Sequence, residues 1–284
     1  MKKYEITDEV NHRGLHRIKA LVNIPSHSVK VGDIGGWIEK EENLSQSGEA
    51  WVSGDAAVFN NAWVYDNAQV FGEARISGKA QVYGNARVSS KARVYCEAQV
   101  YGNAWVYGEA LVSGNAQVFG DAWVSDNASV CDNAWVYGKA LVSGNARVCG
   151  KAQVFGEAWV YGEAQVYGKA RVSGNTQVSG EAHIYGDARV SDDANISGDA
   201  RVSGDAQVSG NADYIVFKNF WSSGRWLTWT RSNNMWCVGC FYGTGAELIK
   251  KAYQDSEVSG KEYERVVKYM ESILNDEKTT EVEK

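Results

Sequence analysis

Proline is almost absent from the sequence: Pro25 is the only one in 284 residues, whereas there are thirty glycines. Abundant glycine without proline argues against a disordered linker and favours regular turns with positive φ angles. No apolar run approaches the length of a transmembrane helix, and the first ten residues lack the apolar stretch of a signal peptide. We therefore expect a soluble, cytoplasmic protein with no membrane partner.

A strong excess of charge is also lacking. The formal net charge is −6, so the chain has no basic surface of the kind that direct nucleic-acid binding requires. Five cysteines, an odd number, fit reduced thiols better than a framework of disulfides. Because the sequence also contains no glycine-rich phosphate loop, no catalytic-triad spacing and no acidic metal cluster, we expect neither a cofactor nor a metal site.

What the sequence does contain is a six-residue repeat that runs from Ala50 to Ala212. Alanine recurs at every sixth position, with Thr176 as the one exception, and valine or isoleucine follows two residues later in each of 27 hexads. Alternation of apolar and other residues is the period-two signature of a strand, and the glycine that usually fills the fifth position suits a corner. Each hexad is therefore predicted to be one short strand and one turn.

Three such hexads close a triangular coil of 18 residues, so 27 hexads predict nine coils. Stacked at the spacing of sheet strands, about 4.8 Å, they form a rod roughly 43 Å long. One coil cannot bury its valines alone, whereas stacking gives each valine a neighbour on both sides, at about 1.5–3 kcal/mol per buried side chain. The predicted fold class is mainly β, a β-helix of stacked coils.

Residues 18 apart stack on one face of this prism, which gathers aromatic side chains into columns. One set, which we call the aromatic column, consists of Tyr65, Tyr83, Tyr101, Phe119, Tyr137 and Phe155. A second set, which we call the tryptophan patch, consists of Trp105, Trp123, Leu141 and Trp159. Like residues can stack as stabilising ladders, whereas a continuous exposed aromatic strip marks a contact surface. Both interpretations stay open.

The remaining segments differ in composition from the repeat. Residues 1–49 are predicted to form an N-terminal β cap, with Trp37 covering the first coil. Residues 213–274 are predicted to form a small C-terminal α+β domain with strands in "YIVFKNF", "RWLTWT" and "MWCVGCF" and two helices. Thr244 with Glu247, and Ser259 with Glu262, form capping boxes that open these helices. Residues 275–284 have nothing to bury and are expected to be a flexible tail.

Two resemblances refine this interpretation. An aliphatic residue followed by a small one four positions later, as in Val100 and Ala104, resembles the hexapeptide repeat of left-handed parallel β-helices, and the handedness is implied by that resemblance alone. Further motifs resemble a group of phage- and prophage-encoded hexapeptide-repeat proteins that pair a start motif, a stack of hexads and a small C-terminal domain. These motifs are "KYEITDEV", "LHRIKAL", "VGDIGGWIEKEENLSQSGEAWV" and "SGR…LTWTR…GCFYGT". The resemblance implies a phage context, hence the cytoplasm of a bacterial host, but no particular reaction.

Candidate catalytic and redox residues are few. Hexapeptide-repeat β-helices are often acyltransferases with a histidine at a trimer interface and a loop that shapes the donor site. Here His183 is the only histidine in the repeat, and no loop interrupts the coils. Cys237 and Cys240 have the spacing of a redox or zinc pair but lie in a predicted strand, so we expect them reduced and packed. Cys131 and Cys149 stack on one face, and because their thiols point side by side we expect no bond between them.

We therefore predict a non-catalytic, phage-associated interaction protein. Its rigid β-helix scaffold binds a protein partner, either a host protein or another copy of itself as a homo-oligomer. A host defence factor such as a nuclease, inhibited by occlusion, is one candidate partner. The alternatives are an acyltransferase-like enzyme acting through His183 and a self-assembling structural protein. The predicted partner-binding residues are the aromatic column, the three tryptophans of the tryptophan patch, and Trp226 and Trp229 of the C-terminal domain.

Overall fold

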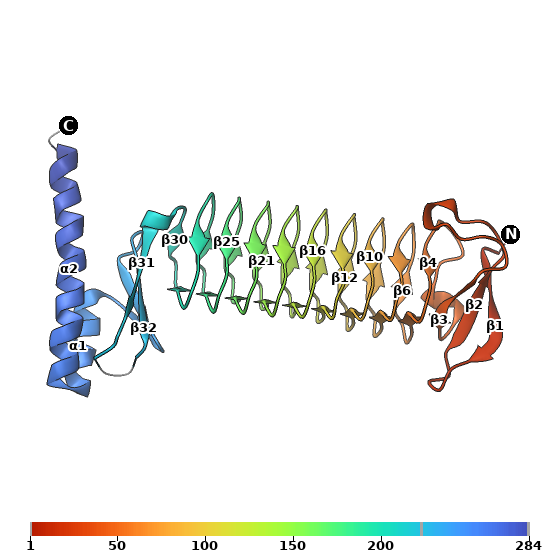
Figure 1. Ribbon diagram of the computed structural model, residues 1–284, viewed down its shortest axis with the longest axis horizontal. Coiled ribbons are helices and arrows are strands. Elements are labelled where there is room, and N and C mark those ends of the chain that lie inside the picture. Colours follow the sequence, from red (N-terminus) through yellow and green to blue (C-terminus); the bar gives the residue numbers. More distant parts are fainter. Residues whose placement is uncertain (1, 222–223, 283–284) are drawn as a thin grey trace.

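The computed structural model describes residues 2–221 and 224–282 and is a rod (Figure 1). A small β-structure lies at the N-terminal end, a solenoid of stacked coils forms the shaft, and a sheet with two helices lies at the C-terminal end. The mainly β prediction and the stacking of coils are confirmed. Within the described residues, no helix has the length and apolar character needed to cross a membrane.

The N-terminal end contains three strands and two short 3-10 helices. Strands β1 (Tyr4–Val10), β2 (His16–Ala20) and β3 (Ile34–Ile38) pair antiparallel in chain order, and the 3-10 helices span Pro25–His27 and Glu41–Asn43. On its other side, strand β3 pairs in parallel with β5 (Ala57–Val58), the first hexad strand of the same sheet. It therefore joins the N-terminal hairpin to the shaft.

The shaft consists of 27 strands of two residues each, distributed over three parallel sheets. The first sheet continues from β3 through β5 (Ala57–Val58), β8 (Arg75–Ile76), β11 (Arg93–Val94), β14 (Leu111–Val112), β17 (Ser129–Val130), β20 (Arg147–Val148), β23 (Gln165–Val166), β26 (His183–Ile184) and β29 (Arg201–Val202). The second sheet contains β4 (Trp51–Val52), β7 (Gln69–Val70), β10 (Arg87–Val88), β13 (Trp105–Val106), β16 (Trp123–Val124), β19 (Leu141–Val142), β22 (Trp159–Val160), β25 (Gln177–Val178) and β28 (Asn195–Ile196). The third contains β6 (Trp63–Val64), β9 (Gln81–Val82), β12 (Gln99–Val100), β15 (Gln117–Val118), β18 (Trp135–Val136), β21 (Gln153–Val154), β24 (Arg171–Val172), β27 (Arg189–Val190) and β30 (Gln207–Val208).

The apolar positions of the hexad and, up to the last hexad, the corner position each have one environment along the shaft. The alanines and the valines or isoleucines are buried, almost all at 0 % exposure, and form one continuous core. The corner residue has a positive φ, as at Gly102 (φ 70°), where a Cβ would lie 2.9 Å from the backbone nitrogen of Gly120 in the next coil. Thr176, which replaces an alanine, remains fully buried because its hydroxyl donates to the Ser173 carbonyl at 2.6 Å.

The solenoid begins earlier than the sequence repeat, which corrects the expectation of nine coils. The first sheet has ten parallel strands, because β3 precedes the nine hexad strands, and Leu44 forms a parallel bridge to Val64. The register pairs Ile38 with Val58 and Trp37 with Ala57. Trp37 therefore faces outward, where the Arg17 guanidinium lies 4.0 Å from its ring, and the prediction that it covers the first coil is wrong.

Open backbone carbonyls of the first hexad coil are covered by the N-terminal segment. The Lys3 ammonium donates to the Ala50 carbonyl at 2.8 Å, and the Asn43 amide donates to the Ala62 carbonyl at 2.9 Å. The backbone nitrogen of Trp37 donates to Ala56 at 2.8 Å. Lys3 is only 4 % exposed, and burial lowers its pKa to about 8.

The C-terminal domain is an antiparallel sheet packed against two helices. The strands β31 (Tyr214–Lys218), β32 (Trp226–Thr230), β33 (Met235–Val238) and β34 (Phe241–Gly243) pair in chain order, after a 3-10 turn at Asn211–Asp213. Helix α1 spans Gly245–Asp255 and has the predicted Thr244–Glu247 capping box.

Helix α2 spans Glu257–Val282 and differs from prediction at both ends. It begins before Ser259, whose backbone nitrogen donates to the Ser256 hydroxyl at 3.0 Å, so the predicted Ser259–Glu262 box lies inside the helix. At the other end, the helix continues through the segment 275–282 that was expected to be a flexible tail.

Side chains at the end of the repeat and beyond it satisfy the open amide groups of the last coil. Within the shaft, the second residue of each hexad donates its N–H to the next coil, and Asn195, Arg201 and Gln207 have no next coil. Their N–H groups donate to Asn211 Oδ1 at 2.9 Å, to Thr228 Oγ1 at 2.8 Å and to Ser232 Oγ at 2.7 Å, respectively. One acceptor therefore closes each of the three sheets, which removes an edge that would pair with other chains.

Candidate interaction surface

The aromatic column exists as predicted and is a continuous stack. Successive ring centroids from Tyr65 to Phe155 lie 4.8–4.9 Å apart, with interplanar angles of 7° or less. This spacing equals the rise per coil, so the parallel sheets hold the rings in contact. All six side chains are half-buried, because each ring covers the faces of its neighbours.

Polar contacts hold the aromatic column further. The hydroxyls of Tyr65, Tyr83 and Tyr101 donate to glutamine side chains at 3.1–3.4 Å, and burial raises the pKa of Tyr65 to about 12. At the far end, the Arg171 guanidinium lies 5.3 Å from the Phe155 ring. The column is thus a stacked ladder between adjacent coils, and it presents ring edges more than ring faces to solvent.

The tryptophan patch has a different geometry. Its four side chains lie on the adjacent strands β13, β16, β19 and β22 of the second sheet and are in register. Trp105 and Trp123 make an edge-to-face contact with centroids 5.7 Å apart, whereas Trp123 and Trp159 are 44 % and 49 % exposed. The patch is therefore a flat apolar surface that crosses four coils.

Polar residues border the tryptophan patch on the two strands that flank it in the sheet. The strand before Trp105 carries Arg87, and the strand after Trp159 carries Gln177. Trp105 is anchored through its indole nitrogen, which donates to the Ser89 hydroxyl at 3.2 Å. An apolar centre with a polar border is the usual composition of a protein-binding surface.

The two tryptophans predicted as contact residues in the C-terminal domain have different environments. Trp226 is half-buried on β32, with the Lys218 ammonium 5.1 Å from its ring. Trp229 is 1 % exposed within the domain core, and its indole nitrogen donates to Asn234 at 2.8 Å. The prediction that Trp229 contributes to an exposed contact surface is therefore wrong, because its side of the sheet is buried in the core that the domain forms with α1 and α2.

Exposed tryptophans also occur outside the tryptophan patch. Trp63 and Trp135, on the third sheet, are 43 % and 40 % exposed, although neither was singled out as a contact residue. Glutamine side chains stack on the strands between them, at Gln81, Gln99 and Gln117. Within their own sheet they are separated by glutamines, but the Trp63 ring stacks on Tyr65 with centroids 4.0 Å apart and the Trp135 ring contacts Phe119 edge to face at 6.4 Å. They therefore provide an internal comparison in which equally exposed tryptophans border the aromatic column instead of the tryptophan patch.

His183 lies beside a small cavity that the sequence did not predict. The cavity forms where the C-terminal domain lies against the shaft, measures about 180 Å³, and is lined by Glu181, His183, Asp199, Arg201, Arg225, Trp226 and Gly239. Burial lowers the pKa of His183, and Arg201 lowers it further. The volume is below the roughly 300–1,000 Å³ typical of ligand pockets, and Arg201 is already bonded to the Gly239 carbonyl at 2.9 Å.

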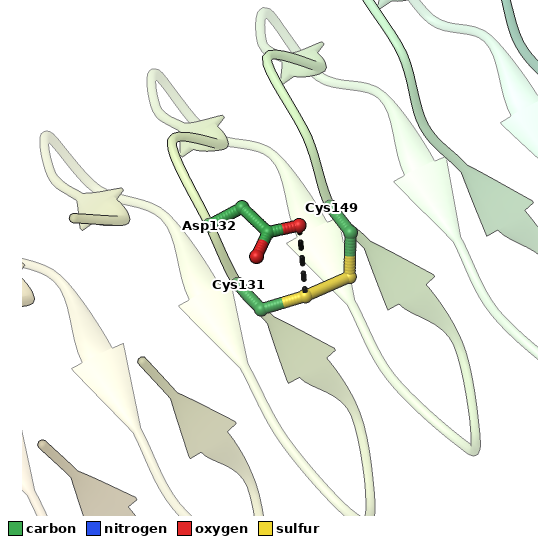
Figure 2. Close-up of side chains that lie close together, drawn as sticks. All are labelled: Cys131, Asp132 and Cys149. Carbon is green, nitrogen blue, oxygen red and sulfur yellow. Dashed lines mark hydrogen bonds between the residues drawn. A yellow bond between two sulfur atoms is a disulfide. The ribbon is translucent and has the colours of Figure 1, made fainter. Parts of the chain in front are cut away.

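The cysteines follow one prediction and contradict another. Cys237 is buried in β33, Cys240 is exposed after the end of that strand, and neither is in a disulfide. The prediction that both are packed in a strand is therefore wrong for Cys240. Cys131 and Cys149, in contrast, form a disulfide across adjacent coils, with Cα atoms 4.7 Å apart (Figure 2). The expectation of no bond is wrong because two thiols side by side at the coil spacing fall within disulfide reach.

Comparison with known families agrees with this architecture. Four segments of the shaft, residues 80–95, 98–114, 164–180 and 194–210, match the model of the YdcK beta solenoid repeat. A search of curated protein sequences finds no match to the chain. Together with the parallel sheets, the matched segments show that the shaft is a repeat β-solenoid similar to that family.

Proposed function

We propose that this protein is a non-catalytic scaffold that binds a protein partner through the tryptophan patch. The observation that carries the proposal is the exposure of Trp123 and Trp159, at 44 % and 49 %, on strands β16 and β22, which lie in register on the two sides of Leu141 in β19. Contiguous exposed aromatic side chains on a soluble surface usually mark a contact site. Trp63 and Trp135 have glutamine neighbours in their own sheet and contact the aromatic column instead.

The flatness and stiffness of the shaft favour a protein over a small molecule. Every strand of the second sheet pairs on both sides except the two at its ends, so the tryptophan patch keeps a fixed spacing at the coil rise. A preorganised surface orders few side chains on binding and therefore loses little conformational entropy. A convex rod offers no deep concavity for a small ligand, whereas another folded surface can cover four coils at once.

The proposal also names two classes of partner for the tryptophan patch. The resemblance to phage-encoded proteins makes a defence protein of a bacterial host, such as a nuclease, the first candidate, with inhibition by occlusion as the mechanism. A second copy of the chain is the alternative partner, which would make the protein self-assembling. Both use the same surface, so one set of variants tests them together.

Two matched double variants test the proposal. Trp123→Gln/Trp159→Gln removes the tryptophan patch, and Trp63→Gln/Trp135→Gln removes two equally exposed tryptophans elsewhere. Glutamine fits both places because it already occupies equivalent positions at Gln69 and Gln81. Each tagged protein is incubated with host lysate and, separately, analysed for self-association by sedimentation velocity.

The proposal predicts capture of one host protein in stoichiometric amount by the wild type and by the control variant, with loss in the patch variant. Dimerisation that is lost only in the patch variant would support the surface and assign a second copy as its partner. Equal behaviour of all three proteins in both assays would overturn the proposal.

A further inference from the structure

Three metal-ligating side chains meet on the first sheet's side of the shaft, away from the tryptophan patch. Cys131 follows β17, Cys149 follows β20, and Asp132 is next to Cys131 (Figure 2). The two sulfur atoms and a carboxylate oxygen all lie within 4.8 Å of one another. Both cysteines are half-buried and Asp132 is exposed, so the cluster is open to solvent.

The backbone holds the two cysteines side by side independently of the disulfide. Strands β17 and β20 pair in register, and the Cys131 nitrogen donates to the Val148 carbonyl at 2.9 Å. The Cα separation of 4.7 Å is thus the coil spacing and persists when the sulfur atoms are not bonded. Two thiolates on one tetrahedral zinc ion, at about 2.3 Å each, lie roughly 3.8 Å apart, which rotation of these side chains provides.

The carboxylate of Asp132 is oriented toward the sulfur atoms. Asp132 has a φ of 60°, and its Oδ2 accepts a hydrogen bond from the Gly150 nitrogen at 3.0 Å while lying 4.0 Å from the Cys131 sulfur. Such outer hydrogen bonds fix the direction of a ligating carboxylate. The second oxygen, Oδ1, remains available to a cation.

A matched site on another corner shows that the fold does not require cysteine here. Asp126 has the same backbone conformation and accepts from the Gly144 nitrogen at the same 3.0 Å. Its flanking residues in the two coils are Ser125 and Ser143 instead of cysteines. The aspartate therefore makes this hydrogen bond with or without cysteines beside it, so the bond does not account for the presence of Cys131 and Cys149.

We propose that, when the disulfide is reduced, Cys131, Cys149 and Asp132 bind a thiophilic divalent cation such as Zn²⁺, with water in the fourth position. Two thiolates and one carboxylate form a donor set that suits this ion. Lys151 and Lys169 line the surface hollow beside Asp132.

The disulfide form is converted to the metal-bound form in two steps. An external dithiol reductant attacks and breaks the Sγ–Sγ bond, supplies two electrons and two protons, and leaves as its own cyclic disulfide. The cation then displaces the two thiol protons to solvent and binds both sulfur atoms. The disulfide and the metal complex thus exclude each other, and the site reports the thiol redox state of its surroundings.

Cobalt(II) is the probe for this site, because its thiolate complexes absorb strongly in the near ultraviolet. The full chain is reduced with a phosphine, desalted under argon and titrated with Co²⁺, alongside an oxidised sample. The variants are Cys131→Ser/Cys149→Ser, Asp132→Asn and, as the matched control, Asp126→Asn. Serine suits the two cysteine positions because Ser125 and Ser143 occupy their equivalents, and circular dichroism checks the fold.

The expected result is one Co²⁺ per chain, with a sulfur charge-transfer band, in the reduced wild type and in Asp126→Asn. The band is lost in the serine variant and in the oxidised protein. Because loss of even an outer-shell partner lowers metal affinity 10–100-fold, Asp132→Asn is expected to bind at least about tenfold more weakly. Retention of the band in the serine variant, or equal affinity of the two asparagine variants, would overturn the assignment.

Discussion

A double-mutant cycle on the aromatic column tests whether its rings stabilise the shaft by contact with their neighbours. Tyr101→Leu removes two stacking contacts, each at 4.8 Å, and the hydrogen bond from its hydroxyl to Gln117 at 3.1 Å. Stacked aromatic pairs contribute about 0.5–1.5 kcal/mol beyond burial, and a hydrogen bond about 1 kcal/mol. The single substitution should therefore lower the free energy of unfolding by about 2–4 kcal/mol.

The coupling energy provides the sharper measurement. Tyr83 is in contact with Tyr101, whereas Tyr137 lies two coils away along steps of 4.8 and 4.9 Å. Combining Tyr101→Leu with Tyr83→Leu should give a coupling of about 1 kcal/mol, the value of one lost ring pair. Combining it with Tyr137→Leu should give a smaller coupling, because these two rings are not in contact and share only Phe119 as a neighbour.

Urea unfolding monitored by both tryptophan fluorescence and far-ultraviolet circular dichroism supplies these free energies. Coincident transitions are needed, because repeat proteins lose two-state behaviour when their coils unfold separately. Where the transitions separate, hydrogen exchange of amides in β12 gives the local stability instead. A coupling between Tyr83 and Tyr101 no larger than that between Tyr101 and Tyr137 would refute the reasoning.

Three further substitutions and one control substitution test the ends and corners of the solenoid. Because the pKa of Lys3 falls from 10.5 to about 8 on folding, the unfolded chain binds a proton that the folded one lacks between these values, so stability rises with pH there by about 3 kcal/mol. Lys3→Met should remove this rise when the unfolding free energies of the two proteins are compared from pH 7.5 to 9.5. Thr228→Val leaves the Arg201 N–H without its acceptor and should cost about 1–3 kcal/mol, with faster exchange of that amide. Gly102→Ala should cost at least about 1–3 kcal/mol at its φ of 70° in thermal unfolding, whereas Ser90→Ala, already a non-glycine residue at φ 58°, should be nearly neutral.

The fold of the shaft could be predicted because the strict six-residue period places the alanine and the valine or isoleucine of every hexad in the same buried environment. The burial of Val100 and Ala104, the positive φ of Gly102 and the stacking of Tyr101 on its neighbours all follow from the six- and 18-residue spacings. Local pattern and global fold agree in each coil, which is the condition under which sequence analysis succeeds.

The turn before the repeat was missed because it uses glycine where later coils use alanine. Gly36 precedes Trp37 and Ile38 as Ala56 precedes its own strand, and a Cβ at Gly36 would meet Val52 Cγ1 at 2.6 Å. The letters "GWI" are thus the repeat with a smaller first residue. The sequence alone does not show that alanine is excluded at position 36, because the atoms that exclude it come from a neighbouring part of the fold.

The remaining errors arose where tertiary contacts decide. Strand β32 has one tryptophan on each face, Trp226 and Trp229, and only the position of the helices decides that Trp229 is the buried one. The Cys131–Cys149 bond depends on whether two parallel side chains rotate toward each other, which the spacing leaves open. The contribution of Asp132 to the same cluster was not found, because its corner position resembles that of Asp126.

Because each end of the shaft is closed by contacts with the coils nearest to it, the number of coils sets the distance between the two ends. The N-terminal segment contacts only the first coils, and Asn211, Thr228 and Ser232 contact only the last one. Deleting or adding 18 residues, such as 98–115, would change the distance between the two ends by about 4.8 Å without rotating one against the other. A change of a single hexad would instead turn the C-terminal domain by one third of a revolution about the axis. The number of hexads therefore sets both quantities: whole coils change the length alone, whereas a single hexad changes the angle and also adds about a third of the coil rise.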